Sequence, residues 1–394
     1  MASADFLIIG GGIAGLSAAS RLAKHGRVVV LEGEEALGYH SSGRSVTFSH
    51  YGIGNSAVRG LTAYSRSFFE APPDGFCATP LYRPQASLYV ATEMMMGQLG
   101  ALHAEMARFT DEVAWLDEAE VRGICPAVRT GPEAVISGVV DTSGLRLDAD
   151  AMLQSFAKAV RSGGGEIQTG RRIPSIARRG QDWLVRTEAG EEWSTPVLVN
   201  AAGAWADEVA GLAGVEPLGL RPMRRTIIVF DPPADADVTA WPFLHTAASD
   251  FYMLPEAGRL LASPVDEIAS DPCDAAPEEY DMAVAAAKVE EYTTLAVRRI
   301  AHSWAGLRSF VADRVPTAGF APDAPGFFWL AGQGGYGLQT APAMADIVEA
   351  LVTGSEWPSG LAPLGVNPEQ IEPERLSGQS LENQNGLAPL NGLR

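Results

Sequence analysis

The stretch of sequence that decides the fold lies at the start of the chain and reads Asp5-Phe6-Leu7-Ile8-Ile9-Gly10-Gly11-Gly12-Ile13-Ala14-Gly15-Leu16-Ser17. A short apolar run leads into the glycine pattern G-x-G-x-x-G, and a helix-forming segment and a second apolar run follow. Gly10 permits a tight turn, Gly12 lets the backbone approach a pyrophosphate, and Gly15 lets the helix pack against the strand. The pattern predicts a strand–turn–helix unit whose helix N-terminus, with its free N–H groups, faces phosphate.

Glu32 ends the second apolar run, 17 residues after Gly15. An acid at this place accepts hydrogen bonds from ribose hydroxyls and repels a 2′-phosphate. A lone glycine pattern is a weak signal, so the two strands, the helix and the acid together carry the prediction of an adenine dinucleotide site. A glycine-rich turn without a ligand is the alternative.

The composition is that of an ordinary globular protein of 394 residues, with 46% hydrophobic and 20% charged residues, which is long enough for two domains. A net charge of −19 argues against nucleic acid or an anionic membrane as a partner. Cys77, Cys125 and Cys273 are scattered, so we expect no disulfide framework and no metal. The first residues carry no basic segment and the apolar run is too short for a membrane span, which favours a cytoplasmic protein.

Three further segments have the character of a cofactor site. Residues 36–45 form a loop of small and hydroxylic residues with one arginine, which suits a phosphate or a flavin ring. Residues 196–205 read as an apolar strand that ends in small residues. Residues 327–337 read as a buried strand and a glycine loop, and a helix is expected over 341–353.

Sheet-like segments interrupt these pieces twice, over 78–92 and from 221 to 261, and a long helix is expected over 278–299. We therefore predict an α/β fold in which a Rossmann-like FAD-binding domain of the glutathione-reductase type is interleaved with an α+β substrate domain on an antiparallel sheet. The expected boundaries are 1–78, 145–220 and 305–372 for the first domain, 79–144 and 221–304 for the second, and 373–394 for a mobile tail.

An early dinucleotide turn combined with a late glycine loop favours a flavin over a nicotinamide. FAD binds in an extended form, so its ADP half needs the first motif and its ring can rest against a distant loop. The N–H groups of that loop, and the helix after it, would face the carbonyl side of the ring.

These motifs together resemble the D-amino-acid oxidase/glycine oxidase superfamily, and within it the bacterial D-arginine dehydrogenases. The motifs that carry the resemblance are Gly10–Gly15 with Glu32, Gly38–Ser45, Val199–Trp205, Trp304–Phe310 and Gln333–Thr340. The resemblance implies oxidation at a Cα–N bond, with the α-hydrogen passing as hydride to flavin N5. The resulting imino acid hydrolyses to a 2-oxo acid and ammonia.

The resemblance also implies roles for individual residues. Arg225, Tyr252 and Arg308 match positions that hold the substrate carboxylate, a task that suits two guanidinium groups and a hydroxyl. The backbone carbonyl of Gly335 matches an acceptor for the substrate amine. The implied contacts to non-covalently bound FAD are Gly10, Gly12, Ile13, Ala14, Gly15, Glu32, Gly33, Ser41, Ser42, Gly43, Arg44, Ser45, Thr47, Phe48, Ile173, Ala201, Gly203, Trp205, Gly334, Gly335, Tyr336, Gly337, Leu338 and Gln339.

The chain departs from the D-arginine dehydrogenases in its substrate pocket. Ser87 stands where they carry a glutamate for the guanidinium, and Phe48 and Ile53 stand where they carry a histidine and a lid tyrosine. A guanidinium buried without a counter-charge is costly. We therefore expect a D-amino acid with a neutral, apolar or aromatic side chain, or an N-substituted amino acid, and we assign His50 and Tyr51 as candidate catalytic residues.

Two other functions stay open. A 2-hydroxy-acid dehydrogenase would use the same carboxylate clamp but would need a histidine base, for which His50 is the candidate. A flavin-binding subunit or sensor without turnover would not need the clamp. The sequence leaves the electron acceptor open between oxygen and a quinone-like molecule.

Overall fold

The computed structural model describes residues 2–377. Its centre is a six-stranded sheet in the order β10-β3-β2-β14-β22-β21, in which only β21 is antiparallel to its neighbour. Chain segments that lie far apart in the sequence supply these strands, which confirms the predicted α/β class. The strands are β2 (Phe6–Ile9), β3 (Val28–Leu31), β10 (Glu166–Gln168), β14 (Val197–Asn200), β21 (Thr317–Phe320) and β22 (Phe327–Ala331).

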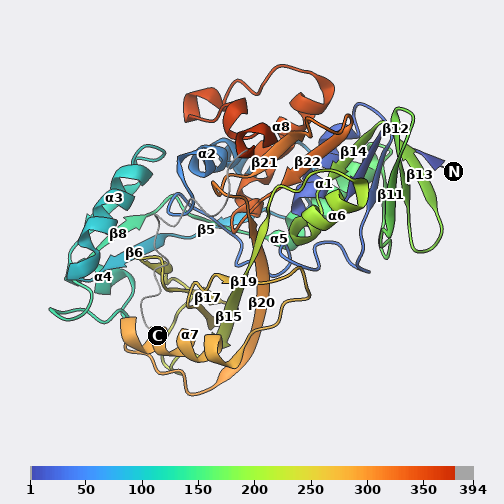
Figure 1. The fold of residues 1–394 in the computed structure, drawn as a ribbon. Coiled ribbons are helices and arrows are strands. Elements are labelled where there is room, and N and C mark those ends of the chain that lie inside the picture. Colours follow the sequence, from blue (N-terminus) through green and yellow to red (C-terminus); the bar gives the residue numbers. More distant parts are fainter. Residues whose placement is uncertain (1, 378–394) are drawn as a thin grey trace.

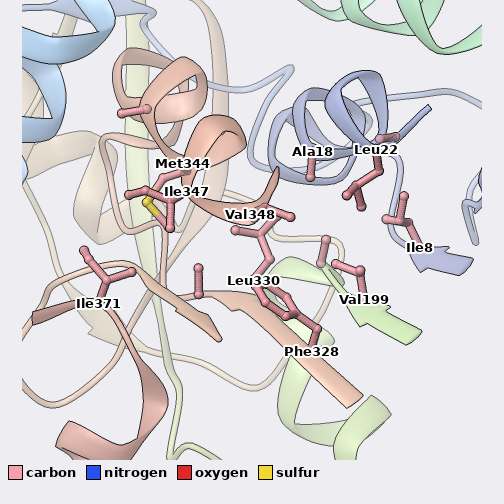
Figure 2. Close-up of a cluster of buried hydrophobic side chains, with 14 of the residues drawn as sticks. Ile8, Ala18, Leu22, Val199, Phe328, Leu330, Met344, Ile347, Val348 and Ile371 are labelled. Carbon is pink, nitrogen blue, oxygen red and sulfur yellow. The ribbon is translucent and has the colours of Figure 1, made fainter. Parts of the chain in front are cut away.

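One face of this sheet is covered by helices. The core there joins β2, β14 and β22 to the helices, with Ile8, Leu22, Phe328 and Val348 in van der Waals contact and fully buried (Figure 2). Burial of such apolar surface is the main favourable term in folding. The helices of this half are α1 (Ile13–Leu22), α2 (Ser56–Glu70), α5 (Ala149–Ser162) and α8 (Gly337–Thr353), so α8 begins four residues before the expected start.

The other face packs against α6 (Ala206–Ala213) and a small four-stranded sheet. That sheet has the order β1-β13-β12-β11 and consists of β1 (Ala2–Ser3), β11 (Ser175–Arg179), β12 (Asp182–Arg186) and β13 (Glu192–Thr195). Its core contacts with β2 and β3 close the far side of the cofactor domain.

A nine-stranded sheet forms the second half of the molecule, in the order β19-β15-β18-β17-β16-β6-β8-β7 with β20 on the free edge of β15 (Figure 1). Helices α3 (Met96–Met106), α4 (Glu118–Ile124) and α7 (Glu279–Tyr292) accompany it. The strands are β6 (Ser87–Ala91), β7 (Val113–Leu116), β8 (Ser137–Asp141), β15 (Arg221–Phe230), β16 (Phe243–Thr246), β17 (Tyr252–Glu256), β18 (Arg259–Ser263), β19 (Ile268–Ala269) and β20 (Ile300–Phe310).

The predicted antiparallel sheet holds except at one place. Strands β6 and β16 pair in parallel, Ser87 opposite Phe243 and Tyr89 opposite His245. This is where the two separate chain segments of the substrate half meet. The helix expected over 278–299 is shorter in the structure, where α7 ends at Tyr292. It ends there because Thr293 has an extended backbone and its hydroxyl donates to the Val289 carbonyl.

The remaining elements are short. A three-stranded sheet combines β4 (Phe48–Ser49), β5 (Tyr82–Pro84) and β9 (Leu145–Leu147). The 3-10 turns are η1 (Glu93–Met95), η2 (Gly203–Trp205), η3 (Ala362–Leu364), η4 (Pro368–Gln370) and η5 (Pro373–Leu376).

The two halves are joined by the long pair β15 and β20, which is hydrogen-bonded from Arg221–Phe310 to Phe230–Ile300 (Figure 1). The boundary expected between residues 304 and 305 falls inside β20. At the other end, residues 373–377 of the expected tail are held in place, since Arg375 pairs with Asp313 at 2.8 Å. The rest of that segment, 378–394, lies outside the described residues. Over residues 2–377, no helix is long and apolar enough to cross a membrane.

Candidate active site

A cavity of about 450 Å³ runs along the carboxyl ends of the parallel strands, where α/β folds bind their ligands. It collects residues from the N-terminal glycine turn, the 38–45 loop, the end of β14, β20 and the late glycine loop. Of the expected cofactor contacts, those that line it are Gly10, Gly12, Ile13, Ala14, Glu32, Gly33, Ser41, Ser42, Ser45, Ile173, Ala201, Gly203, Trp205, Gly334, Gly335, Gly337 and Leu338.

The first glycine turn has the geometry that a dinucleotide requires. Gly10 has φ +111°, and a Cβ there would overlap the carbonyl oxygen of Ala201. A Cβ on Gly15 would overlap the carbonyl oxygen of Gly10, so Gly15 lets helix and strand approach without lining the cavity itself. The turn therefore presents bare backbone and the N-terminus of α1 to the cavity.

Glu32 is fixed at the edge of this turn. Its carboxylate accepts the Gly11 N–H at 2.6 Å and the Glu34 N–H at 2.8 Å. The side chain lines the cavity beside Gly33, where a ribose hydroxyl would meet it.

The serines of the 38–45 loop tie it to both halves of the molecule. Ser42 Oγ accepts the Ile13 N–H at 3.0 Å, and the Ser41 hydroxyl donates to the Leu307 carbonyl at 2.7 Å. Both side chains line the cavity. They keep hydroxyls beside the helix N-terminus, a suitable place for phosphate oxygens.

Arg44 does not reach the cavity in the way the sequence suggested. Its guanidinium pairs with Asp274 and donates to the Ala275 carbonyl at 2.9 Å and the Ala305 carbonyl at 3.2 Å. Because these partners belong to the substrate half, Arg44 fastens the 38–45 loop to that half. A pattern of small residues around one arginine could not distinguish this role from phosphate binding.

Five more of the expected cofactor residues lie outside the cavity lining of the described chain, namely Gly43, Thr47, Phe48, Tyr336 and Gln339. Gln339 is buried, donates to the Thr62 hydroxyl at 2.8 Å and accepts the His50 N–H at 3.3 Å. The Tyr336 hydroxyl bonds the Arg314 carbonyl. These two side chains therefore hold neighbouring segments of the chain together outside the cavity lining.

Arg308 lies where the cavity reaches the substrate half. It is 7% exposed and lines the cavity, and a Cβ on Gly335 would lie 3.6 Å from its Cγ. Its one hydrogen bond within residues 2–377 goes to the Gly306 carbonyl at 3.3 Å, and no carboxylate there lies within ion-pair distance. Burial lowers the pKa of Arg308 to about 10, with the nearby Tyr252 and Arg225 as smaller influences of opposite sign.

Arg225 occupies the same sheet face as Arg308, since Arg225 pairs with Gly306 and Met223 with Arg308 across β15 and β20. Its Nε donates to the Asp266 carbonyl at 2.7 Å and its Nη2 to Glu267 at 3.2 Å. Arg225 is therefore already paired, and Arg308 is the guanidinium that still requires an anion.

Tyr252 begins β17 and is 5% exposed, with a hydroxyl that has no hydrogen-bond partner among the described residues. Around it lies an aromatic cluster formed by Phe48, His50, Tyr89, Phe243 and His245. Ring centroids are 5.3 Å apart for Phe243 and Tyr252, and 5.9 Å for His245 and Tyr252. Phe243 and His245 were not predicted from the sequence, although their alternation on a short strand was a signal that both share one face.

The two histidines of this cluster are uncharged at neutral pH. Burial lowers the pKa of His50 to about 3, with Arg59 adding to the effect, and burial holds the pKa of His245 well below its usual range. His50 Nδ1 lies 2.5 Å from the Tyr89 hydroxyl, and its ring stacks on His245 at 5.2 Å. Burial also raises the pKa of Tyr89, so this phenol stays protonated.

The other expected pocket residues separate into two groups. Phe48 packs 4.7 Å from Phe243, Ser87 is buried opposite Phe243 on β6, and a Cβ on Gly335 would lie 3.9 Å from Ile53 Cδ1. Tyr51 instead stacks on Phe109 at 5.8 Å, in a hydrophobic cluster that it shares with Tyr89 but not with Tyr252. Thus His50 joins the ring cluster of Tyr252 and Tyr51 does not.

A sequence profile described as "FAD dependent oxidoreductase", the DAO family, matches residues 5–351. The chain belongs to the DAO family. FAD is thus the cofactor, and the bare glycine turn and the cavity fit it. Glu32 would hold its ribose, the α1 N-terminus its pyrophosphate, and the loop at Gly334–Gly335 its ring.

Relatives of this DAO-family chain carry the names of different enzymes. This chain is 27% identical over 269 residues to the hydrogen cyanide synthase subunit HcnC of Pseudomonas aeruginosa, and the match covers 66% of this chain and 61% of HcnC. It is 30% identical over 224 residues to an L-2-hydroxyglutarate dehydrogenase of Salmonella houtenae, covering 54% of the chain and 50% of that enzyme. The matches thus span about half to three fifths of these relatives.

Solved structures share the fold over nearly the whole chain. Glycine oxidase from Geobacillus kaustophilus superposes with a TM-score of 0.79 at 20% identity, covering 93% of this chain and 99% of that one. L-proline dehydrogenase from P. horikoshii superposes with a TM-score of 0.81 at 19% identity, covering 95% of this chain and 98% of that one. At these identities the likeness establishes the fold and leaves the substrate of this DAO-family oxidoreductase open.

Proposed function

We propose that this FAD-dependent oxidoreductase oxidises an amino acid at its Cα–N bond, giving an imino acid that hydrolyses to a 2-oxo acid and ammonia. The observation that carries the proposal is Arg308, a buried guanidinium on the cavity wall without an ion-pair partner in residues 2–377. A buried charge without a partner is costly, so the site favours an anionic ligand group.

The protein groups would act by binding and orienting the substrate. Arg308 and the unpartnered Tyr252 hydroxyl would bind the carboxylate, with Arg225 adding positive potential from its paired position. The Gly335 carbonyl would accept a hydrogen bond from the amine. A fixed carboxylate and amine leave the Cα–H in one orientation, which is the main contribution that positioning can make.

Bound FAD would supply the two-electron acceptor for the α-hydrogen. The sequence analysis expects it to be held without a covalent bond, and the contacts proposed above need none. The Arg308 charge would also favour a negatively charged ligand group near the ring.

The substrate amine must lose its proton before the α-hydrogen leaves with its electrons. His50 and His245 are neutral at physiological pH because burial lowers the pKa of each ring, and this low proton affinity makes both rings weak bases for an ammonium group. We therefore expect the rate to rise with pH as the bound amine deprotonates. A rate that is flat between about pH 6 and about pH 10 would contradict this expectation.

A 2-hydroxy-acid dehydrogenase is the second candidate. The observation that favours it is the uncharged imidazole of His245 beside Tyr252, with His50 stacked on it, because oxidation of an alcohol needs a base for the hydroxyl proton. The relative named as an L-2-hydroxyglutarate dehydrogenase is consistent with this alternative.

The finer substrate predictions remain as the sequence analysis made them. A particular closeness to the D-arginine dehydrogenases, and the choice between D-amino and N-substituted amino acids, stay predictions. Ser87 lies buried at the position of their guanidinium-binding glutamate, so a neutral side chain remains our expectation.

The deciding experiment is anaerobic mixing of the FAD-loaded protein with a panel of D-amino, L-amino, N-alkyl-amino and 2-hydroxy acids. Bleaching of the visible flavin band by amino acids would support the proposal, and bleaching by hydroxy acids alone would select the second candidate. A protein that binds FAD but is reduced by no member would instead point to a flavin-binding subunit without turnover.

A further inference from the structure

The sheet face that carries Tyr252 presents further polar atoms that are unpartnered within the described chain, namely Ser87 Oγ and His245 Nε2. Tyr252, His245 and Tyr89 are directly opposite one another on β17, β16 and β6. His245 Nε2 is buried and has no hydrogen-bond partner among the described residues. Buried polar groups are almost always satisfied in folded proteins, so an unpaired imidazole nitrogen requires an explanation.

A purely structural role does not provide that explanation. His50, the neighbouring imidazole, has its Nδ1 2.5 Å from the Tyr89 hydroxyl, so the cluster satisfies one histidine and leaves the other without a partner. The His245 ring lies 3.9 Å from Phe243 and 5.0 Å from Tyr89 by centroid, which is van der Waals packing alone. The His245 residue as a whole is only partly buried, unlike Phe243 and Tyr89, although its Nε2 itself is covered.

The position of His245 relative to the proposed carboxylate clamp identifies what it would contact. Its ring is 5.9 Å from that of Tyr252, on the next strand and on the side away from Arg225 and Arg308. A substrate whose carboxylate meets Tyr252 and Arg308 would extend its side chain along this row. His245 would then meet a group a few bonds beyond Cα.

The surroundings of His245 select for an uncharged group. The rings beside it belong to Phe243, Tyr89 and His50, all neutral. The formal charges that act on His50 and Tyr89 are Arg59 and Asp141. Arg59 donates to the Tyr51 carbonyl at 2.7 Å, and Asp141 accepts the Ser143 N–H at 2.9 Å. Asp141 lies opposite Ser87 and its second carboxylate oxygen is buried without a partner in residues 2–377, but burial raises the pKa of this group and so favours its neutral form. An anionic side chain would therefore lose hydration at this wall without gaining an opposite charge, and a cationic one would meet only this weakened carboxyl group.

We infer that His245 is a specificity-determining residue whose Nε2 hydrogen-bonds a neutral polar group, such as an amide or hydroxyl, on the side chain of the substrate. The inference rests on the proposed function, because the carboxylate clamp sets the direction of the side chain. It adds a hydrogen-bonding group to the aromatic wall of the pocket, for which a neutral or aromatic side chain is expected from the sequence.

The test uses two sets of substrates matched in shape, each with an apolar, a neutral polar and an anionic member. The first set is leucine, asparagine and aspartate, the second is methionine, glutamine and glutamate, and lysine is added as a cationic amino acid. Both stereoisomers are mixed anaerobically with the FAD-loaded protein and flavin reduction is followed. Binding of the matching acids without the α-amino group is measured separately from the perturbation of the flavin spectrum. The rate of flavin reduction by the neutral polar member of a set should exceed the rate with its apolar member by about 10-fold to about 100-fold. This is the range that corresponds to leaving a buried polar group unpaired.

His245→Phe keeps a flat ring and removes the hydrogen bond, so it should abolish this preference while reduction by the apolar member continues. His245→Gln restores a nitrogen at a similar distance and should recover part of the preference, and it serves as the test should His245→Phe fail to fold. His302→Phe, at an exposed histidine of β20, is the matched control and should change nothing.

The inference is overturned if the apolar, anionic or cationic member of the sets is preferred, or if His245→Phe leaves the ratio unchanged. These outcomes differ from failure of the proposed function itself, in which no amino acid of either hand reduces the flavin. In that case the spectral binding of the des-amino acids still reports whether His245 discriminates among them.

Discussion

Replacement of Arg308 by methionine should have opposite effects on activity and on stability. Methionine is similar in length and apolar, so it fills the space of the buried side chain without a charge. Removing one partner of a buried charge pair costs about 2–5 kcal/mol, and about 1.4 kcal/mol corresponds to tenfold, so kcat/KM should fall by about 30-fold to about 5,000-fold.

The stability of the substrate-free protein should instead increase. Burial lowers the pKa of Arg308 to about 10, which means that the fold disfavours its charged form. The unfolded chain keeps the ordinary, higher pKa, so the penalty is fully present below about pH 10 and fades as the pH rises through that value. Replacing such a charge with an apolar residue typically stabilises a protein by about 1–4 kcal/mol.

Steady-state kinetics with the best substrate of the panel and urea unfolding of the substrate-free protein would measure both effects. Arg122→Met, at an exposed arginine of α4, is the control and should alter neither. An unchanged kcat/KM, or a loss of activity accompanied by a loss of stability, would refute the reasoning. The first result would mean that Arg308 does not meet the substrate, and the second that it is a structural residue.

Three further predictions follow from the geometry. Gly10→Ala should abolish flavin binding, because its Cβ would overlap the Ala201 carbonyl. Gly164→Ala, also at positive φ but in open space, should keep its flavin and lower the free energy of unfolding by about 1–3 kcal/mol. Equal flavin content in the two purified variants would contradict this. Stability should fall as the pH drops from 6.5 to about 3, because the unfolded chain protonates His50 and the fold does not, and His50→Gln should flatten the dependence measured by urea unfolding. Arg44→Met and Asp274→Asn should retain flavin and show a coupling of about 0.2–1 kcal/mol in a double-mutant cycle, while loss of flavin from Arg44→Met alone would favour phosphate binding.

The cofactor half could be predicted in detail because its signals are local. A turn that only glycine can adopt and an acid at the end of the next strand lie within one short stretch, and both line the cavity. The late glycine loop has the same kind of signal, since Gly334 has φ +56° and a Cβ there would overlap the Phe310 ring.

The substrate half could be predicted only in part because its contacts join distant segments. No local pattern specifies that β6 pairs in parallel with β16, or that Arg44 meets Asp274. Similarly, His245 has no partner in the sequence that would mark it as part of a site. It becomes a candidate only when its neighbours in space are known to leave its nitrogen unsatisfied.

The parallel pairing of β6 and β16 also has a consequence for synthesis of the protein. Ser87 and its partner Phe243 are 156 residues apart, so β6 leaves the ribosome well before the strand it must join. At about 5–20 residues per second, that edge waits about 8–30 seconds during translation. Until then the edge of β6 that will meet β16 offers unpaired backbone groups to other nascent chains, so a chaperone that covers this edge would protect the growing polypeptide from strand pairing with its neighbours.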